Sequence, residues 1–298
     1  MKKIESPYPY FGSKRRVIND VWARFGNVEN YIEPFAGSLA ILLGNPNVPK
    51  IETMNDLDCL VPNFWRSIAA DPDLVAYHAD YPVIEADLHA RHRWIISKEA
   101  DDFKHKINHD PNYYDAKIAG WWVWGMCCSL GITFAKQRGL NCKPFLSMTG
   151  QKITTCQDVK EWFSILQERM KKVRVCNGSW DRVCTPSVTY KNKSLTKAGM
   201  VGVFLDPPYL VENREDKLYR VETDVFPQVC EWALLNADNE RMRIAVCGLD
   251  GDFNPPPNWE TFHWKTTGGF SSFAKDEERG KENSKKEVIW FSPNCLKI

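Results

Sequence analysis

The sequence contains 298 residues, of which 43% are hydrophobic and 26% are charged, and its formal net charge is +1 at pH 7. This is ordinary globular composition with enough chain for a large core, as one large domain with an insertion or as two domains. A charge so close to zero excludes nucleic-acid binding through a general basic excess, so any such binding requires a local patch.

The ten cysteines include no Cys-x-x-Cys pair, which argues against a zinc ribbon or a thioredoxin-like motif. We expect free thiols in a reducing compartment and no bound metal. The first residues carry no apolar core of a signal peptide, and no apolar stretch approaches the roughly 20 residues of a membrane span. We therefore expect a soluble cytoplasmic protein.

The first part of the chain alternates between helix and strand. Residues 15–25 place apolar side chains on one face of a helix, and a short strand follows at 30–33. Residues 39–43 look like a buried helix, and 50–56 like a second strand that ends in an acidic residue. This order predicts an α/β fold with a parallel sheet and crossover helices.

Residues 63–170 break that alternation, because they contain helix-like stretches rich in tryptophan and charge. We interpret them as a mostly helical insertion that contains an irregular polar loop. The expected helices are 63–70, 85–107, 113–128 and 157–170, and the loop spans 129–151.

After the insertion the pattern of strands returns. The expected strands are 173–176, 204–206, 244–248, 262–265 and 287–292, with one helix at 226–237. We therefore expect three segments, with residues 1–62 and 171–298 as the two parts of an α/β core and residues 63–170 as the insertion.

An apolar run at 201–205 ends abruptly in Asp206-Pro207-Pro208-Tyr209. The prolines fix φ and have no N–H to donate, so the strand cannot continue through them. The result is a rigid turn at the carboxyl end of a strand, where open α/β sheets place their ligands. Its carboxylate, carbonyl and aromatic face could grip a flat ring that bears an amine. The alternative is an ordinary strand end with a surface tyrosine.

The segment Glu33-Pro34-Phe35-Ala36-Gly37-Ser38 joins a strand to a helix. Gly37 allows a close backbone approach, and the helix start offers free N–H groups to a ligand. Neither Gly-x-Gly-x-x-Gly nor a Walker loop occurs, which disfavours NAD or ATP. Asp56 ends the next strand, where an acidic side chain can accept both hydroxyls of a ribose. An ordinary turn at Gly37 and a helix cap at Asp56 are the alternatives.

The segment Tyr8-Pro9-Tyr10-Phe11-Gly12-Ser13-Lys14 precedes the first helix. Its aromatic rings, flexible Gly-Ser and cation suit the carboxylate of a zwitterionic ligand. A terminal loop that aromatic rings hold in place is the alternative.

Taken in order, these four motifs resemble the Dam-like family of DNA adenine N6-methyltransferases, which use S-adenosylmethionine. The resemblance covers about residues 1–70 and 170–298. It implies a class I methyltransferase with a Rossmann-like sheet, in which 63–170 recognises the target. It also implies methyl transfer to the N6 amine of an adenine flipped out of double-stranded DNA, without a metal or an obligatory protein partner. A restriction-linked or solitary role, in a bacterial cell or a phage-infected host, stays open.

The resemblance assigns roles to the matched residues. Asp206 and the Pro207 carbonyl would accept hydrogen bonds from the target amine, next to Pro208, and Tyr209 would stack on the flipped base. The cofactor would be held by Tyr10, Phe11, Lys14, Glu33, Phe35, Ala36, Gly37, Ser38 and Asp56, with Asp206 beside it.

Two positions depart from the family pattern. Leu39 stands where the family usually has a second glycine. Ser179 stands where an acidic residue is common, and Asp181 is a possible substitute two residues on. The alternatives are therefore a DNA-binding relative that has lost cofactor affinity, or a methyltransferase for cytosine N4, an RNA base or a protein glutamine.

Two stretches could supply the positive surface that DNA requires. Residues 171–197 carry seven lysines and arginines against Asp181, and residues 131–147 carry three without an acid. Phosphate contact and reading of base edges both use such side chains. The DNA-binding candidates are Lys136, Gln137, Arg138, Asn141 and Lys143.

Overall fold

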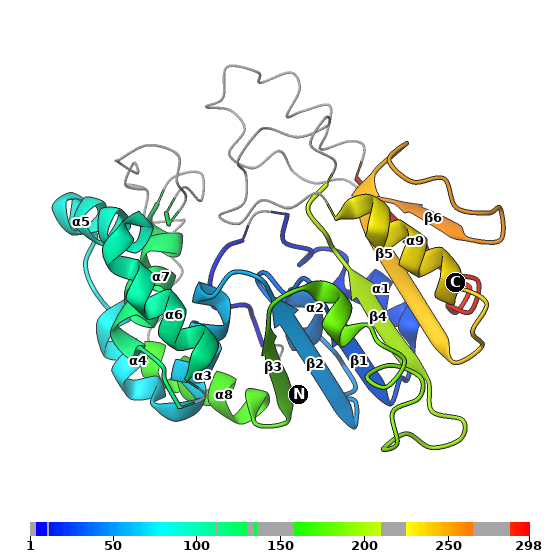
Figure 1. The fold of residues 1–298 in the computed structure, drawn as a ribbon, viewed down its shortest axis with the longest axis horizontal. Helices are drawn as coiled ribbons and strands as arrows, with labels where there is room; N and C mark the ends of the chain where they lie inside the picture. Colours follow the sequence, from blue (N-terminus) through cyan, green and yellow to red (C-terminus); the bar gives the residue numbers. More distant parts are fainter. Residues whose placement is uncertain are drawn as a thin grey trace.

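The computed structural model describes residues 4–10, 12–110, 112–129, 134–135, 158–209, 225–264 and 287–298. Within these ranges the chain forms a seven-stranded sheet with helices on both faces and a group of helices beyond one edge (Figure 1). None of the helices in these ranges is long and apolar enough to cross a membrane.

The sheet has the strand order β3-β2-β1-β4-β5-β7-β6. The first five strands in this order are parallel, and β7 runs antiparallel to both β5 and β6. The α/β fold with a largely parallel sheet is therefore confirmed, as a class I methyltransferase fold requires. The strands are β1 (Asn30–Glu33), β2 (Ile51–Asp56), β3 (Val173–Asn177), β4 (Val201–Leu205), β5 (Met242–Leu249), β6 (Glu260–His263) and β7 (Glu287–Phe291).

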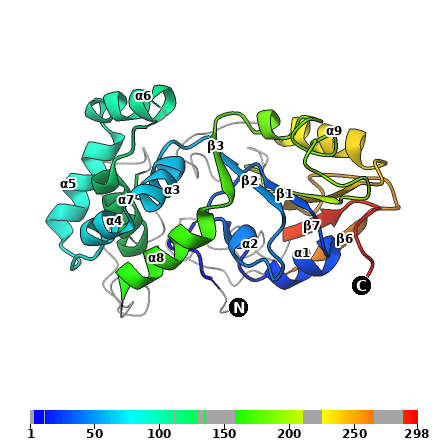
Figure 2. The same ribbon diagram turned by 90° about the horizontal axis from the view of Figure 1, so that it is seen from below.

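Alternate side chains of the central strands enter two separate hydrophobic clusters. Tyr31 and Phe204 join the cluster that contains α1 (Ile18–Phe25) and α2 (Ala40–Leu43). Ile32 and Val203 join the cluster that contains α9 (Phe226–Asn236). Figure 2 shows α9 on one face of the sheet and α1 and α2 on the other. Burial of both faces explains why these strands read as continuous apolar runs.

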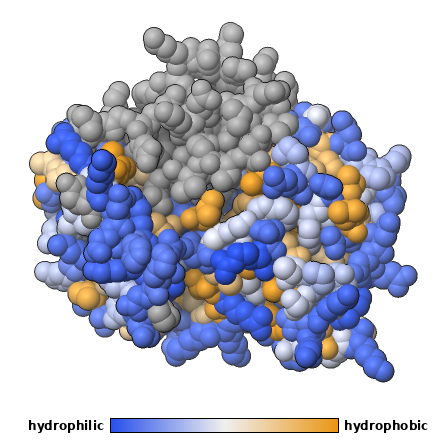
Figure 3. All heavy atoms as spheres, viewed as in Figure 1, coloured by the Kyte–Doolittle hydropathy of each residue, from blue (hydrophilic) through white to orange (hydrophobic). Residues whose placement is uncertain are grey.

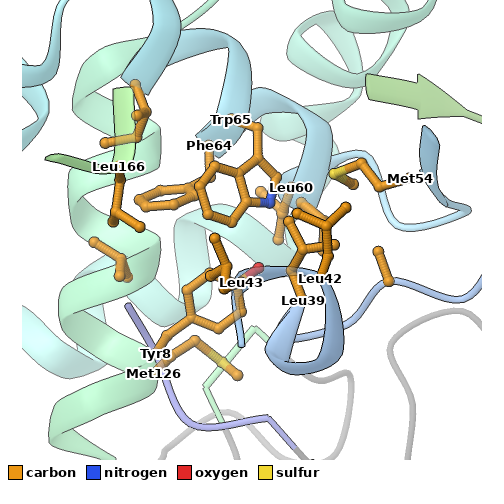
Figure 4. Packing of buried hydrophobic residues seen from close by; sticks show 14 of the residues in the cluster. Tyr8, Leu39, Leu42, Leu43, Met54, Leu60, Phe64, Trp65, Met126 and Leu166 are labelled. Carbon is orange, nitrogen blue, oxygen red and sulfur yellow. The ribbon is translucent and has the colours of Figure 1, made fainter. Parts of the chain in front are cut away.

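The helices between β2 and β3 lie beyond the β3 edge of the sheet (Figure 1). Trp122 and Trp124 are 2% and 0% exposed and share one hydrophobic cluster with Met54 of the sheet, so they are core residues. Figure 4 shows where α2 meets the helices, with Leu39 and Leu42 packed near Trp65. The helices are α3 (Leu60–Ala70), α4 (Pro72–Ala79), α5 (Glu85–Ile96), α6 (Asp101–His109), α7 (Ala116–Cys128) and α8 (Val159–Met170).

Two details of the helical part differ from the prediction. The expected helix at 85–107 is two helices, because Ser97 is extended (φ −81°, ψ 173°) and its hydroxyl donates to the Trp94 carbonyl at 2.7 Å. Helix α4 was not predicted. Pro72 occupies the first turn, where proline is tolerated, and Asp71 caps the helix by accepting from Leu74 N at 3.0 Å. The division into 1–62, 63–170 and 171–298 stays a prediction.

The described surface is mostly hydrophilic on the face seen in Figure 3. Its larger exposed apolar side chains belong to separate elements, such as Tyr77 on α4 and Leu235 on α9. Scattered apolar residues of this kind are normal for a protein surface.

Candidate active site

The carboxyl ends of the neighbouring strands β1, β2 and β4 lie side by side at one end of the sheet. Ile32 lies opposite Thr53 of β2 and opposite Val203 of β4, so the residues that end or follow these strands lie at the same level. Glu33, Asp56 and Asp206 therefore line one cavity of about 160 Å³. The carboxyl ends of parallel strands are where such sheets bind their ligands.

Most of the predicted site residues line this cavity. They are Tyr10, Lys14, Glu33, Phe35, Ala36, Gly37, Ser38, Asp56, Asp206 and Pro208. Pro207 is buried behind it, and Tyr209 contacts it through Lys14. Phe11 and the DNA-binding candidates Lys136, Gln137, Arg138, Asn141 and Lys143 lie outside the described residues, so these assignments stay predictions.

The turn after β1 depends on Gly37, whose φ is +45°. Its N–H donates to Asp56 Oδ2 at 2.9 Å, and its carbonyl accepts from the Tyr8 hydroxyl at 2.8 Å. A Cβ at this position would lie 2.8 Å from Cδ1 of Tyr10. Position 37 therefore requires glycine both for its backbone conformation and for the ring that packs on it.

Leu39 adopts a left-handed conformation, with φ +57° and ψ 28°, directly before α2. Glycine adopts this conformation at least cost, which explains the glycine of the family pattern. The Leu39 side chain is fully buried in the hydrophobic cluster of Figure 4. Leu39 thus adopts the backbone conformation that glycine would adopt, with some strain, and its side chain adds buried apolar surface.

Asp56 lines the cavity and stabilises the turn after β1. Its Oδ1 accepts from Asp58 N at 2.9 Å and its Oδ2 from Gly37 N. Asp58, and not Asp56, accepts from Leu60 N at 3.0 Å at the start of α3, so the alternative of Asp56 as the helix cap is wrong.

Asn55 was missed by the sequence analysis, although it directly precedes Asp56. Its Nδ2 donates to the Pro34 carbonyl at 3.0 Å and to the Gly178 carbonyl at 2.9 Å, which ties together the ends of β1, β2 and β3. Its Oδ1 is buried and has no hydrogen-bond partner within the described ranges. A buried acceptor beside a cavity is a position for a ligand donor.

At the far side of the cavity, Ser179 takes the place of the family's acidic residue. Its hydroxyl donates to Asp181 Oδ1, so a carboxylate is held beside the cavity wall. The rings of Phe35 and Trp180 stack at 6.0 Å between centroids and also line the cavity. Asp181 itself is exposed and is not among the residues that line the cavity, so its role in place of the missing acid stays a prediction.

Glu33 lies beneath the cavity and is 3% exposed. Its Oε2 accepts from the Tyr31 hydroxyl at 3.0 Å and from Leu42 N at 3.1 Å. Burial outweighs these bonds and raises the pKa of Glu33 from 4.5 to about 8. The carboxyl group is therefore mostly protonated at neutral pH in the folded protein.

This shift predicts a pH-dependent stability that Glu33→Gln should remove. Below pH 4.5 both the folded and the unfolded states bind the proton, and between 4.5 and about 8 only the folded state does. The free energy of unfolding should therefore fall with rising pH across this window, by roughly 4 kcal/mol at 1.36 kcal/mol per pKa unit. Denaturant unfolding at pH 5, 7 and 9 measures it, and parallel pH profiles for wild type and variant would contradict it.

Lys14 bonds to the Asp-Pro-Pro-Tyr turn. Its Nζ donates to Asp206 Oδ1 at 2.9 Å and Oδ2 at 3.0 Å, to the Tyr209 hydroxyl at 3.0 Å and to the Gly12 carbonyl at 2.7 Å. Burial disfavours the ammonium, but Asp206, Tyr209 and Glu287 outweigh it and raise the pKa of Lys14 well above its usual value. Burial raises the pKa of Asp206, and Lys14 offsets part of that rise.

Glu287, at the start of β7, was also missed. Its Oε2 accepts from the Tyr209 hydroxyl at 3.4 Å and lies 3.9 Å from Lys14 Nζ. The surrounding sequence is rich in charges of both signs, so nothing marked this carboxylate as special. Only the pairing of Glu287 with Leu249 of β5 brings it to the site.

The basic stretch 171–197 lies mostly at the amino ends of the strands, opposite the end of the sheet that carries the cavity. Val173 begins β3, and Thr196 donates to Glu29, which precedes β1. Its lysines are thus near the amino ends of the strands, and their role in DNA binding stays a prediction. Arg182 is different, because it donates to the Asn177 carbonyl at the carboxyl end of β3 at 2.8 Å.

The comparisons with known proteins agree with this geometry. The family model of the D12 class N6 adenine-specific DNA methyltransferases matches residues 10–240. No curated protein matches the chain in a sequence search. The match spans most of the chain and includes the cavity turn, the helical segment and the Asp-Pro-Pro-Tyr turn. The chain therefore belongs to the D12 class of N6 adenine-specific DNA methyltransferases, enzymes that methylate adenine in DNA.

Proposed function

We propose that the cavity at the carboxyl ends of β1, β2 and β4 binds S-adenosylmethionine and presents it to an adenine flipped out of double-stranded DNA. One observation carries this proposal: Asp206 opens onto the same cavity as the Gly37 turn and Asp56. A group that accepts an amine and a group that accepts a ribose are thus within reach of one bound molecule.

The residues present fit such a cofactor. Gly37 lets the Tyr10 ring pack directly on the turn, and both residues line the cavity. Asp56 places a carboxylate on the cavity wall that could accept from ribose hydroxyls, and Asn55 Oδ1 is a buried acceptor without a partner in the described part of the chain. Phe35 and Trp180 offer flat walls to an aromatic ring.

The chemistry divides between the cofactor and the protein. S-adenosylmethionine, which the family implies as the donor, supplies an electrophilic methyl group when bound. Asp56 and the Gly37 turn would hold it, with Ser38, Glu33, Lys14 and Tyr10 around it, because all of these residues line the cavity. Orientation of the two reactants in one site supplies much of the acceleration, because it replaces a bimolecular encounter.

Asp206 and the Pro207 carbonyl make the target amine a better nucleophile. The lone pair of an exocyclic amine is delocalised into the ring, so the free base reacts poorly. Accepting its two hydrogens favours a more tetrahedral nitrogen and stabilises the positive charge that develops there. Asp206 can also take the proton that this nitrogen releases after it has been methylated.

Tyr209 offers the stacking surface for the base. An adenine inside a duplex cannot reach a cavity of this kind, so it must be extruded at a cost of a few kcal/mol. Stacking on an aromatic side chain returns about 1–3 kcal/mol of that cost. The segment 131–147, with Lys136, Gln137, Arg138, Asn141 and Lys143, is our candidate for contact with the surrounding DNA.

Mapping modified bases tests the proposal most directly. DNA from cells that express the chain should contain N6-methyladenine at one recurrent sequence, and DNA from cells that express Asp206→Ala should not. Methyl groups found only at cytosine N4, on RNA or on protein would contradict the adenine assignment.

Calorimetry tests cofactor binding separately. Titration of S-adenosylmethionine into the protein should give saturable heat with one site per chain, and Asp56→Ala should weaken the affinity about tenfold or more through the loss of charge-assisted hydrogen bonds. Asp73→Ala, an exposed carboxylate on α4, is the matched control. No heat at high protein concentration would favour a DNA-binding relative that has lost its cofactor.

A further inference from the structure

The ammonium of Lys14 lies between two carboxylates. Its Nζ is 2.9 Å and 3.0 Å from the two oxygens of Asp206 and 3.9 Å from Oε2 of Glu287. The Lys14 side chain is 2% exposed and that of Glu287 is 14% exposed. The Tyr209 hydroxyl joins both, because it accepts from Lys14 and donates to Glu287.

This arrangement weakens Asp206 as an acceptor for the target amine. Both oxygens of Asp206 accept from Lys14, which takes two of the about four acceptor positions of the carboxylate and offsets its negative charge. Lys14 needs another carboxylate when it leaves Asp206, because a buried ammonium without a counter-charge is strongly destabilising. A second carboxylate for Lys14 would leave Asp206 its full negative charge and acceptor capacity while the adenine is bound.

We propose that Glu287 is that second carboxylate, and that Lys14 transfers from Asp206 to Glu287 when the target amine binds Asp206. The proposal rests on the function proposed above for Asp206. It requires the 3.9 Å distance to shorten to the roughly 2.8 Å of a charge-assisted hydrogen bond. The bond from Lys14 to the Gly12 carbonyl, at 2.7 Å, anchors the ammonium during this small movement.

The backbone holds Glu287 in place for this role. Glu287 pairs with Leu249 at the end of β5, and the next residue, Val288, pairs with His263 of β6. Both positions lie outside the residues 10–240 that the family model matches. Glu287 is thus a positioning residue, which acts through Lys14 and Tyr209 and need not touch the adenine.

The charge balance explains how Glu287 assists the reaction. Two carboxylates face one ammonium in this cluster, so one negative charge is left over. Positive charge appears on the target nitrogen as the methyl group is transferred, and fixed charges of opposite sign stabilise it. Without Glu287, Lys14 would compete with the amine for Asp206 throughout the reaction.

Glu287→Gln tests the exchange, because it keeps the shape and removes the charge. With genomic DNA that lacks adenine methylation and saturating tritiated S-adenosylmethionine, we expect the single-turnover rate to fall tenfold or more. Cofactor affinity by calorimetry should stay unchanged. The control Glu231→Gln, at an exposed position on α9, should match wild type. A wild-type rate in Glu287→Gln would overturn the proposal.

The double variant Lys14→Met/Glu287→Gln separates exchange from a structural role. Once Lys14 has no second partner, its ammonium only blocks Asp206, so its removal should make the double variant faster than Glu287→Gln alone. A purely structural Glu287 would give a double variant as slow as the single one or slower, and that result would overturn the exchange.

A crystal structure of the wild-type enzyme gives the test without any substitution. With S-adenosylhomocysteine and a duplex that carries the mapped site, Lys14 Nζ should bond to Glu287 Oε2 and leave at least one oxygen of Asp206. Retention of both Asp206 bonds beside a bound adenine would overturn the exchange. Activity in Asp206→Ala would refute the proposed function itself, whereas an inactive Asp206→Ala with a normal Glu287→Gln refutes only this inference.

Discussion

Asp206→Ala should lower the rate of methyl transfer by about 10³-fold or more, as expected for the loss of a preorganised group at the reacting atom. The cavity turn at Gly37 and Asp56 does not depend on Asp206, so cofactor affinity should stay near that of wild type. Tritium transfer to unmethylated genomic DNA measures the rate, and calorimetry with S-adenosylmethionine measures the affinity.

Two controls protect this result from a trivial explanation. Asp250→Ala removes an exposed carboxylate just after β5 and should be neutral. Thermal unfolding of Asp206→Ala should show a folded protein, because Lys14 keeps Glu287 as a nearby carboxylate. Activity within tenfold of wild type in folded Asp206→Ala would refute the role of Asp206.

Gly37→Ala should abolish measurable cofactor binding and destabilise the fold. The new Cβ would meet the Tyr10 ring at 2.8 Å and 2.9 Å, and the left-handed φ of +45° costs a non-glycine residue roughly 1–2 kcal/mol. Relief of the clash must move the aromatic ring or the turn, and both line the cavity. Calorimetry with S-adenosylmethionine and denaturant unfolding measure the two effects.

Gly251→Ala separates the steric effect from the backbone effect. Gly251 also has a positive φ, +96°, but nothing lies within 4 Å of the Cβ position. It should therefore lose stability through its backbone alone and keep full cofactor affinity. If Gly37→Ala binds S-adenosylmethionine as wild type does, the turn is not part of the cofactor site.

Much of the candidate site could be predicted from the sequence, because several of the site residues are constrained by their immediate neighbours in the chain. The prolines of the Asp206-Pro207-Pro208-Tyr209 turn must end a strand, and Gly37 must stand where a backbone bends beside a ring. Such constraints produce motifs of a few residues that can be recognised in the sequence. The order of the motifs then placed them at the carboxyl ends of neighbouring parallel strands, which the structure confirms.

Contacts between distant residues could not be predicted in the same way. Lys14 and Asp206 are 192 positions apart, and only the packed structure shows that they form an ion pair. The Lys14 side chain therefore bonds to the Asp206-Pro207-Pro208-Tyr209 turn, although the sequence suggested only a cation for the carboxylate of a ligand. Glu287 was hidden for a similar reason, since its role depends on β7 pairing between β5 and β6.

The helix prediction was wrong where one polar side chain determines where a helix begins or ends. The break after Ile96 depends on the hydroxyl of Ser97, and the start of α4 depends on the carboxylate of Asp71. Neither side chain alters the apolar periodicity on which the helix prediction was based. The prediction therefore joined two helices across Ser97 and missed α4 altogether.

The insertion of β7 between β5 and β6 also has a consequence for synthesis of the protein. Strand β6 pairs with β7, and β7 carries Glu287, so residues 287–291 are needed to complete both the sheet and the charge cluster at Lys14. During translation, every motif of the family is made before these residues leave the ribosome. A growing chain thus contains the Gly37 turn and the Asp206-Pro207-Pro208-Tyr209 turn for a time without β7, and the charge cluster at Lys14 is complete only after residues 287–291 have been made.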